Sequence, residues 1–344
     1  MSKYKILVFG AGSVGAHHIN AARTLKSDVF VTDINKEQII YLKESLYPER
    51  YGKWDKKISI INYKNVSKIN TRFDLIVLGI SPIHHLSELK KCIKNLKFKK
   101  VLIEKPLFTY NQKVNQNYFK KYEKKIYCGF NHEISESILF LKKYIKSQKN
   151  IFKIDIIWKE SFKYLLKAHP WVKKIEDSYL SDISKGGGVL HEFSHAVHLT
   201  NSLKKLVKIN DSLKLESKIL FKKNKNQKKY DFSSSIFFKS KNFNMNTYID
   251  GISMPPKKTI TISSKDEKCI WERLGNKNLE KITIDKKGFK KIVKIFKINR
   301  PKDFITQTKA LISNKKMDND NIKCNNFNNS LETTSLIKQC IRNF

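Results

Sequence analysis

The feature that most constrains the fold is a glycine-rich turn between a short apolar segment and a helical pattern. Residues 10–15 read Gly-Ala-Gly-Ser-Val-Gly, the apolar run 5–9 precedes them, and a helical pattern from Val14 to Leu25 follows. Glycines at this spacing let the chain turn tightly, bring backbone N–H groups close to a pyrophosphate and let helix and strand pack closely. The helix N-terminus also favours negative charge. The turn therefore predicts a parallel α/β sheet that begins with a dinucleotide site.

Asp33 supports this interpretation of the turn. It lies at the end of the second predicted strand, about 20 residues beyond the glycines, where a carboxylate accepts hydrogen bonds from an adenosine ribose. Its charge disfavours a 2′-phosphate, so NAD is the expected cofactor. NADP remains the alternative, because Asn35 and Lys36 can soften that preference. The expected cofactor contacts are Gly10, Gly12, Ser13, Val14, Gly15 and Asp33.

The chain consists of two regions that differ in their pattern of apolar residues. The first 125 residues alternate short apolar runs with amphipathic stretches, the rhythm of repeated β-α-β units. We expect strands at 5–9, 29–32, 58–61, 75–79, 101–103 and 126–129, and helices at 14–25 and 86–96. From about residue 150 the pattern changes to alternating strands, at 152–158, 233–238, 244–249 and 259–263. Near the end, a polar surface loop is expected at 314–329 and a helix at 331–341.

The predicted fold class is therefore α/β with two domains. Residues 1–125 form a doubly wound parallel sheet that binds the dinucleotide. Residues 126–344 form an α+β domain with an open, largely antiparallel sheet, and its last helix can pack back on the first domain.

The net charge of +38 raises the question of nucleic-acid binding. Only six of the 69 basic residues are arginine, whereas base readout depends on the bidentate arginine fork. Lysine, asparagine and isoleucine are raised together, as in an AT-rich coding sequence, and the lysines are spread along the chain. We therefore expect no nucleic-acid partner, but a positive field that concentrates anionic substrates.

Membrane and export classes are also disfavoured. No apolar run approaches the ~20 residues that cross a bilayer, and the run 6–9 is too short for a signal peptide. The five cysteines are widely spaced and form no CxxC pair, so neither a disulfide framework nor a zinc site is expected. A reducing cytoplasm is the expected location.

Glu104, Lys105 and Pro106 form a second candidate motif directly after the predicted strand 101–103. This is the carboxyl edge of the sheet, where ligands of open α/β folds bind. Proline keeps Lys105 out of helical geometry and fixes a turn, with a cis bond as one option. Taken alone, a solvated lysine at a strand end is the simpler interpretation in so lysine-rich a chain.

The third motif is the glycine triplet 186–188 and the ten-residue segment that it opens. If the chain is helical from Val189, Glu192 and His195 are three apart and share a face, so carboxylate and imidazole can meet. His191 and His195 have a metal-ligand spacing, but the acid is misplaced for HExxH and no cysteine is near, so we expect no metal. The alternative is a buried histidine bonded to a backbone carbonyl.

Together these motifs resemble the Gfo/Idh/MocA family of NAD(P)-dependent sugar oxidoreductases. The resemblance rests on GAGSVG at residue 10, ISPIHH at 80, EKP at 104, CGFN at 128 and GGGVLHEFSH at 186. It implies a Rossmann domain, an α/β domain whose open sheet covers a sugar or nucleotide-sugar substrate, and a homo-oligomer formed through that sheet. Glu192 stands three residues before His195, where members commonly have aspartate four before. This variant is typical of relatives from surface-polysaccharide biosynthesis.

The resemblance also implies residue roles. Lys105 binds the reacting hydroxyl or carbonyl, and Glu192 and His195 take the acidic and histidine positions. Around the nicotinamide it implies Ser81, Pro82, His85, Glu104 and Lys105 as cofactor contacts. Around the substrate it implies Lys105, Asn131, Glu192 and His195, to which we add Trp171. Trp171 is one of several aromatic and polar residues that can stack on a pyranose, although it is equally an ordinary core residue.

The expected reaction moves a hydride between nicotinamide C4 and a secondary alcohol or ketone. His195 is the first choice for the base, since imidazole titrates near neutral pH, and Lys105 is the electrostatic partner and alternative base. We expect segments near residues 10, 105 and 195 to converge on one crevice. The rival interpretations are a non-catalytic NAD(H)-binding sensor, a nucleic-acid binder and a reductase of a non-sugar carbonyl.

Overall fold

The computed structural model describes residues 4–166, 174–275, 278–313 and 321–342, which pack into two compact units. Unit 1 comprises Met1–Phe108, Gln112–Ile134 and Arg300–Ser330, and unit 2 comprises Thr109–Asn111, Ser135–Asn299 and Leu331–Phe344. The predicted domain division between residues 125 and 126 stays a prediction. None of the helices in the described ranges is both long and apolar enough for a membrane span.

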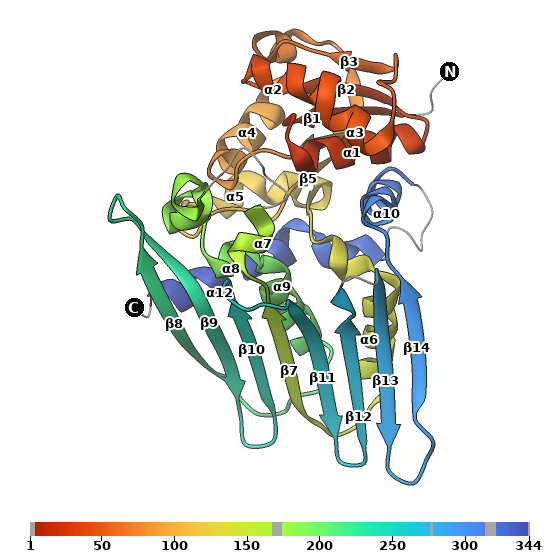
Figure 1. Cartoon of the computed structure of the whole chain (residues 1–344), viewed down its shortest axis with the longest axis vertical. Helices are drawn as coiled ribbons and strands as arrows, with labels where there is room; N and C mark the ends of the chain where they lie inside the picture. The colour runs from red at the N-terminus through yellow and green to blue at the C-terminus, as the bar shows by residue number, and fades with distance from the viewer. Residues whose placement is uncertain (1–3, 167–173, 276–277, 314–320, 343–344) are drawn as a thin grey trace. The chain divides into compact units, whose positions relative to one another are not determined.

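Unit 1 is built on a six-stranded parallel sheet with the order β3-β2-β1-β4-β5-β6 (Figure 1). The strands are β1 Lys5–Phe9, β2 Asp28–Thr32, β3 Ile58–Ile60, β4 Arg72–Leu78, β5 Lys97–Ile103 and β6 Ile126–Cys128. Each lies at a predicted position. The strand order reverses between β1 and β4, and such a switch point opens a crevice at the carboxyl ends of the strands. The predicted doubly wound parallel sheet is confirmed.

Helices cover the sheet of unit 1. They are α1 Ser13–Thr24, α2 Lys36–Tyr41, α3 Tyr47–Tyr51, α4 Pro82–Asn95, α5 Gln116–Phe119 and α10 Arg300–Ile312. A π-helical turn, Leu42–Leu46, joins α2 to α3. The late helix α10 packs on α1, where the Phe304 ring stacks on His17 at 4.8 Å between ring centres. Strand β1 is buried from Ile6 to Phe9. A strand that is covered on both faces must be apolar along its length, and these residues are all apolar.

The expected surface loop at 314–329 is wrong for residues 321–329. Asn325 and Phe327 are buried there, and the Asn325 side chain donates a 2.9 Å hydrogen bond to the Phe130 carbonyl. A polar, asparagine-rich composition is typical of a surface loop. Here, however, an asparagine amide makes a hydrogen bond to a buried backbone group, which allows the segment to be buried. The helix predicted at 331–341 is confirmed as part of α12 Phe327–Arg342.

Unit 2 is built on an eight-stranded sheet with the order β14-β13-β12-β11-β7-β10-β9-β8. All neighbours are antiparallel except β7 and β10, which confirms the largely antiparallel prediction. The strands are β7 Ile151–Lys159, β8 Lys214–Lys223, β9 Lys229–Lys239, β10 Asn244–Asp250, β11 Lys257–Ser264, β12 Glu267–Arg273, β13 Leu279–Lys286 and β14 Ile292–Lys297.

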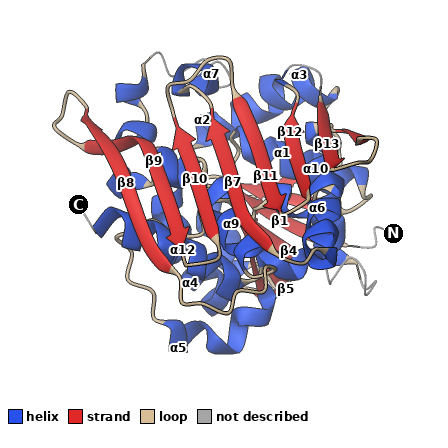
Figure 2. Cartoon of the chain, turned by 90° about the horizontal axis from the view of Figure 1, so that it is seen from below, coloured by secondary structure: helices blue, strands red, loops and turns tan. Residues whose placement is uncertain are grey.

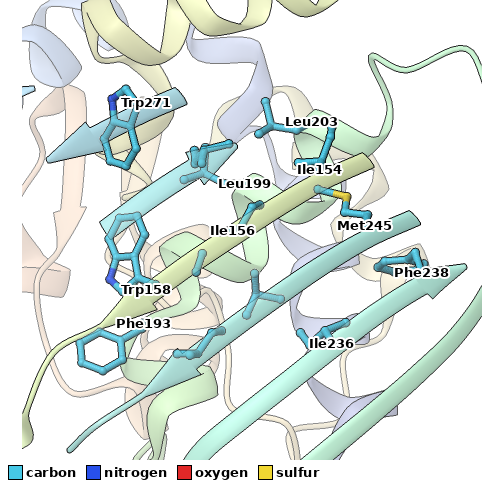
Figure 3. Close-up of a cluster of buried hydrophobic side chains, with 14 of the residues drawn as sticks. Ile154, Ile156, Trp158, Phe193, Leu199, Leu203, Ile236, Phe238, Met245 and Trp271 are labelled. Carbon is cyan, nitrogen blue, oxygen red and sulfur yellow. The ribbon is translucent and has the colours of Figure 1, made fainter. Parts of the chain in front are cut away.

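One face of this sheet carries the core of unit 2. Along β7, Ile154, Ile156 and Trp158 are buried, because alternate residues of a strand point to the same face. They pack against α6 Glu136–Ser147, α9 Ser194–Lys204 and the last turns of α12. Figure 3 shows Leu199 and Leu203 of α9 beside β7. Burying each such side chain contributes roughly 1.5–3 kcal/mol. Figure 2 shows no helix from the described part of unit 2 over the opposite face of the sheet.

Candidate active site

The glycine-rich turn of unit 1 has the geometry that a dinucleotide requires. Gly10 has φ +103°, and a Cβ on Gly15 would lie 1.9 Å from the Gly10 carbonyl oxygen, so α1 packs tightly against the end of β1. Gly12 differs, because apart from its chain neighbours no described residue lies within 4 Å of the point where its side chain would begin. A pyrophosphate can therefore approach the backbone at Gly12, next to the first N–H groups of α1.

Asp33 is fixed beside this turn. Its Oδ2 accepts a 2.8 Å hydrogen bond from the Ala11 N–H, and its Oδ1 accepts one of 2.8 Å from the Asn35 N–H. Each carboxylate oxygen keeps a second lone pair for a ribose hydroxyl. Asn35 in turn caps α2 by accepting from the Glu37 N–H at 2.9 Å. The residues present thus fit the adenosine half of a dinucleotide.

Arg50, on α3, is a residue of this region that sequence reasoning missed. Its Nη1 donates to Ser13 twice, to Oγ at 2.9 Å and to the carbonyl oxygen at 3.2 Å. The only signal in the sequence is the rarity of arginine, since six of the 69 basic residues are arginine and lysine would be the default. A guanidinium beside the first residue of α1 provides donors for a phosphate oxygen.

Replacing Arg50 by methionine is expected to weaken NADH binding about tenfold, the usual value of a hydrogen bond to a charged group. A fluorescence titration of NADH measures this. Arg23→Met is the matched control, because Arg23 lies on α1 but pairs with Asp55 at 2.6 Å. An Arg50→Met variant that binds NADH as tightly as the control would contradict the assignment.

The turn after β4 carries the predicted residues Ser81, Pro82 and His85. Ser81 is exposed and precedes α4, and Pro82 opens that helix. His85 is completely buried, with Nε2 3.0 Å from the Ile80 carbonyl oxygen and Nδ1 3.0 Å from that of Pro106. Burial lowers the pKa of His85. The ring therefore joins the β4 turn to the segment that follows Lys105.

Glu104 and Lys105 follow β5, and they have different surroundings. The Glu104 carboxylate is buried, meets His18 Nε2 of α1 at 2.7 Å and accepts from the Lys105 N–H at 3.2 Å. A Cβ on Gly129 would lie 2.7 Å from this carboxylate, which explains the glycine. Lys105 is the one residue between Val101 and Thr109 that is not buried. Its bond to Pro106 is cis.

Asn131 follows β6 at the same edge of the sheet. Its Oδ1 is buried and accepts no hydrogen bond from any residue that the structure describes. A buried acceptor without a partner is costly, so this atom is suited to a ligand hydroxyl. Gly10, Ser81, Lys105 and Asn131 thus all follow the carboxyl ends of parallel strands in unit 1.

Unit 2 holds the glycine triplet and the histidines. His191 is buried, donates from Nδ1 to the Gly187 carbonyl at 3.1 Å and accepts the Tyr110 N–H on Nε2 at 3.1 Å. Burial lowers its pKa to about 4, so the ring is neutral at neutral pH. Both ring nitrogens serve the backbone, as in the alternative of a structural histidine. The predicted contact Trp171 lies outside the described residues.

Glu192 and His195 are both half-buried, in contrast to their buried neighbours His191 and Ala196. The Tyr179 hydroxyl donates to Glu192 Oε2 at 2.8 Å, and the His195 ring stacks near Trp158 with 6.1 Å between ring centres. From the sequence, Tyr179 is one of the aromatic residues that can stack on and hydrogen-bond a pyranose, and its contact with Glu192 was not predicted.

The condition that the chain is one continuous helix from Val189 through His195 is not met. Helix α8 Val189–Glu192 ends at Phe193, whose φ of −97° and ψ of 31° interrupt the helical path, and α9 begins at Ser194. The physical reason is tertiary, because the buried Phe193 ring stacks on Phe162 at 5.8 Å between ring centres. Glu192 and His195 therefore lie on two helices rather than one turn apart on a single helix.

Comparison with known proteins identifies unit 1. Residues 4–130 match the model of an oxidoreductase family described as having an NAD-binding Rossmann fold, Gfo/Idh/MocA. These residues are thus similar to the Gfo/Idh/MocA family, over the sheet of unit 1. This confirms the resemblance, the oxidoreductase class and the nicotinamide dinucleotide cofactor. A search of curated proteins found no match to the sequence.

Solved structures share the fold over the whole chain. A dehydrogenase from Clostridium difficile is 17% identical with a TM-score of 0.66, and the match covers 100% of both chains. An inositol dehydrogenase homologue from Azotobacter vinelandii, complexed with NAD+, is 10% identical with a TM-score of 0.72, covering 99% of this chain and 95% of its own. The UDP-N-acetylglucosamine 3-dehydrogenase of Acidithiobacillus ferrooxidans is 10% identical with a TM-score of 0.67, covering 98% and 96%.

Proposed function

We propose that this protein is a member of the Gfo/Idh/MocA family and an NAD-dependent dehydrogenase or reductase of a sugar or nucleotide-sugar. It would move hydride between nicotinamide and a secondary alcohol or ketone. The observation that carries the proposal is the shared edge of the unit 1 sheet, where the glycine turn, the Ser81 turn and the partly exposed Lys105 follow adjacent strands β1, β4 and β5. That edge, at the switch point, is where this fold class binds dinucleotides.

The proposal assigns each predicted catalytic residue a task. A bound nicotinamide supplies the hydride acceptor or donor. Lys105 binds the reacting oxygen and stabilises its partial negative charge, while Glu104, bonded to His18 and the Lys105 N–H, holds the lysine backbone. His195 takes the hydroxyl proton during oxidation and returns it during reduction. Glu192 orients His195 or holds a substrate hydroxyl, and Lys105 is the alternative base.

Two observations support a substrate that is anionic and carries hydroxyls, such as a nucleotide-sugar. The net charge of +38 attracts anions, and the buried Asn131 Oδ1, which accepts from no described residue, can accept from a hydroxyl. Proteins of the same fold include the UDP-N-acetylglucosamine 3-dehydrogenase above. A role in surface polysaccharide biosynthesis in the cytoplasm is part of this proposal.

A substrate screen tests the proposed activity. NAD or NADP is mixed with the protein and a panel of sugars, UDP-sugars and simple secondary alcohols, and the absorbance band of reduced nicotinamide is followed. We expect reduction of NAD with a sugar or UDP-sugar. Cofactor binding without turnover of any panel member would favour the sensor, and turnover of only non-sugar alcohols would favour the alternative enzyme.

We also propose a homo-oligomer formed through the uncovered face of the unit 2 sheet. This face carries half-buried Ile157, Tyr248 and Thr259 on neighbouring strands. Light scattering is expected to give a mass of at least two chains, and Tyr248→Lys is expected to reduce it. A monomer at micromolar concentration would contradict this part of the proposal.

A further inference from the structure

Asp231, on β9 of unit 2, is a buried carboxylate that the proposed chemistry does not use. It is fully buried, and its Oδ2 accepts a 2.9 Å hydrogen bond from the Leu190 N–H and one of 3.1 Å from the Ser234 hydroxyl. Leu190 belongs to the first turn of α8, whose N–H groups have no partner within the helix. The N-cap position of α8 is Gly188, which has no side chain to accept from them. Asp231 therefore caps α8 from a neighbouring strand.

The third glycine of the triplet makes this cap sterically feasible. A Cβ on Gly188 would lie 1.7 Å from Asp231 Oδ1, and Gly188 has φ +80°, a conformation that favours glycine. The second glycine has a related task, since a Cβ on Gly187 would lie 2.1 Å from the Tyr179 carbonyl oxygen. The triplet thus lets two neighbouring segments contact the start of α8 directly.

Burial and the contacts of the cap have opposite electrostatic effects on Asp231. Burial raises the pKa of Asp231 to about 6, and its hydrogen bonds to the α8 backbone and to Ser234 oppose that rise. The carboxyl is mostly ionised at neutral pH, and an anion is favourable at a helix N-terminus. Oδ1 is buried and takes no hydrogen bond within the described part of the chain, so the carboxylate is held by its Oδ2 contacts with α8 and Ser234.

The cap is important because α8 leads to the predicted site residues Glu192 and His195. The helix has one turn and ends at Glu192, and His195 follows in the first turn of α9. The capped Leu190 N–H is two residues from Glu192 and five from His195. Such a short helix has little stability of its own, so its position depends on tertiary contacts.

We propose that Asp231 is a positioning residue that fixes α8 and thereby sets Glu192 and His195 for proton transfer. The roles of Glu192 and His195 rest on the proposed function, whereas the placement of α8 by Asp231 does not. Removing the carboxylate leaves the Leu190 N–H buried and unpaired, which costs more than an ordinary hydrogen bond. Helix α8 is then expected to shift toward another acceptor.

Three variants separate positioning from general stability. Asp231→Ala removes the acceptor. Asp231→Asn keeps an oxygen for the Leu190 N–H, and it has no charge to bury. Folding raises the pKa of the Asp231 carboxyl from 3.8 to about 6, so the folded protein loses stability as the pH rises from 3.8 to about 6. The amide of Asp231→Asn does not titrate, so this variant avoids that loss. Glu280→Gln is the control, because Glu280 is another buried carboxylate of unit 2 and accepts from Ser137.

Histidine NMR reads the position without a substrate. The protein is labelled with 15N-histidine. The ring current of Trp158 influences the chemical shifts of the His195 ring, so these shifts report its position relative to Trp158. The His191 ring is distinguished by its protonation on Nδ1, which the hydrogen bond to the Gly187 carbonyl maintains. We expect Asp231→Ala to move the His195 signals, and Asp231→Asn and Glu280→Gln to leave them at the wild-type positions. The His195→Gln spectrum assigns the peaks. If the alanine variant does not fold, Asp231→Ser replaces it, since its hydroxyl is too short to reach Leu190.

Kinetics then test the catalytic consequence. With a sugar that the wild type oxidises, Asp231→Ala is expected to lower kcat about 10- to 100-fold, the usual effect of a displacement of about 1 Å. Its Kd for NADH is expected to match the wild type. His195 signals that do not move, or a kcat equal to that of Glu280→Gln, would overturn the proposal. If the wild type turns over no sugar, the proposed function fails, and the NMR spectra alone decide whether Asp231 places α8.

Discussion

Replacing Lys105 by alanine is expected to lower turnover at least ~100-fold, because the variant loses the group that stabilises charge on the reacting oxygen. Cofactor affinity is expected to stay nearly intact, since the glycine turn and Asp33 are unaffected. The measurement is kcat with the sugar identified by the screen, together with an NADH titration.

Lys99→Ala is the matched control for this variant. Lys99 lies on the same strand, β5, but it is exposed and pairs with Asp74 at 2.6 Å. It should keep wild-type kinetics. If Lys105→Ala also turned over at the wild-type rate with the authentic substrate, Lys105 would be an ordinary surface lysine and the assignment would fail.

Replacing Gly12 by alanine is expected to abolish tight NADH binding while leaving the fold intact. Apart from its chain neighbours, no described residue lies within 4 Å of the new methyl group, and Gly12 has φ −81°, which alanine adopts freely. The methyl would instead occupy the space through which a pyrophosphate approaches the backbone. We expect NADH affinity to fall about 100-fold with a melting temperature close to the wild type.

Gly15→Ala provides the contrast, because the same methyl group there would lie 1.9 Å from the Gly10 carbonyl oxygen. Overpacking of this kind typically costs about 1–3 kcal/mol, so this variant should lose both stability and NADH binding. Calorimetry and NADH titration of the two variants check the pair. A Gly12→Ala variant that binds NADH normally would show that the dinucleotide does not contact this turn.

Most strands of unit 1 could be predicted, because a strand buried on both faces must be apolar along its length. The predicted strands were too short only where charged side chains interrupt the apolar pattern. In β5 it began at Val101, whereas the strand begins at Lys97, since exposed lysines alternate there with half-buried residues. The glycine turn could also be predicted, because its backbone geometry restricts the residue type at each position.

The rest of the site could not be predicted because it depends on contacts between distant residues. His18 and Glu104 are 86 positions apart, and Leu190 and Asp231 are 41 apart. A local sequence pattern cannot predict contacts between residues that lie so far apart in the chain. The break at Phe193 is a similar case, because the helical propensity of the segment is overridden by the packing of one ring. The convergence of Lys105, Glu192 and His195 on one substrate remains a prediction from the sequence.

The most direct test of the central claim is to follow the hydride itself. Sugars and UDP-sugars deuterated at their ring carbons are incubated with the protein and NAD, and the reduced cofactor is analysed by mass spectrometry. The account predicts NADH that carries one deuterium at nicotinamide C4, formed by the wild type and Lys99→Ala and nearly absent with Lys105→Ala. Unlabelled NADH, or NAD that binds but is never reduced by any member of the panel, would contradict it.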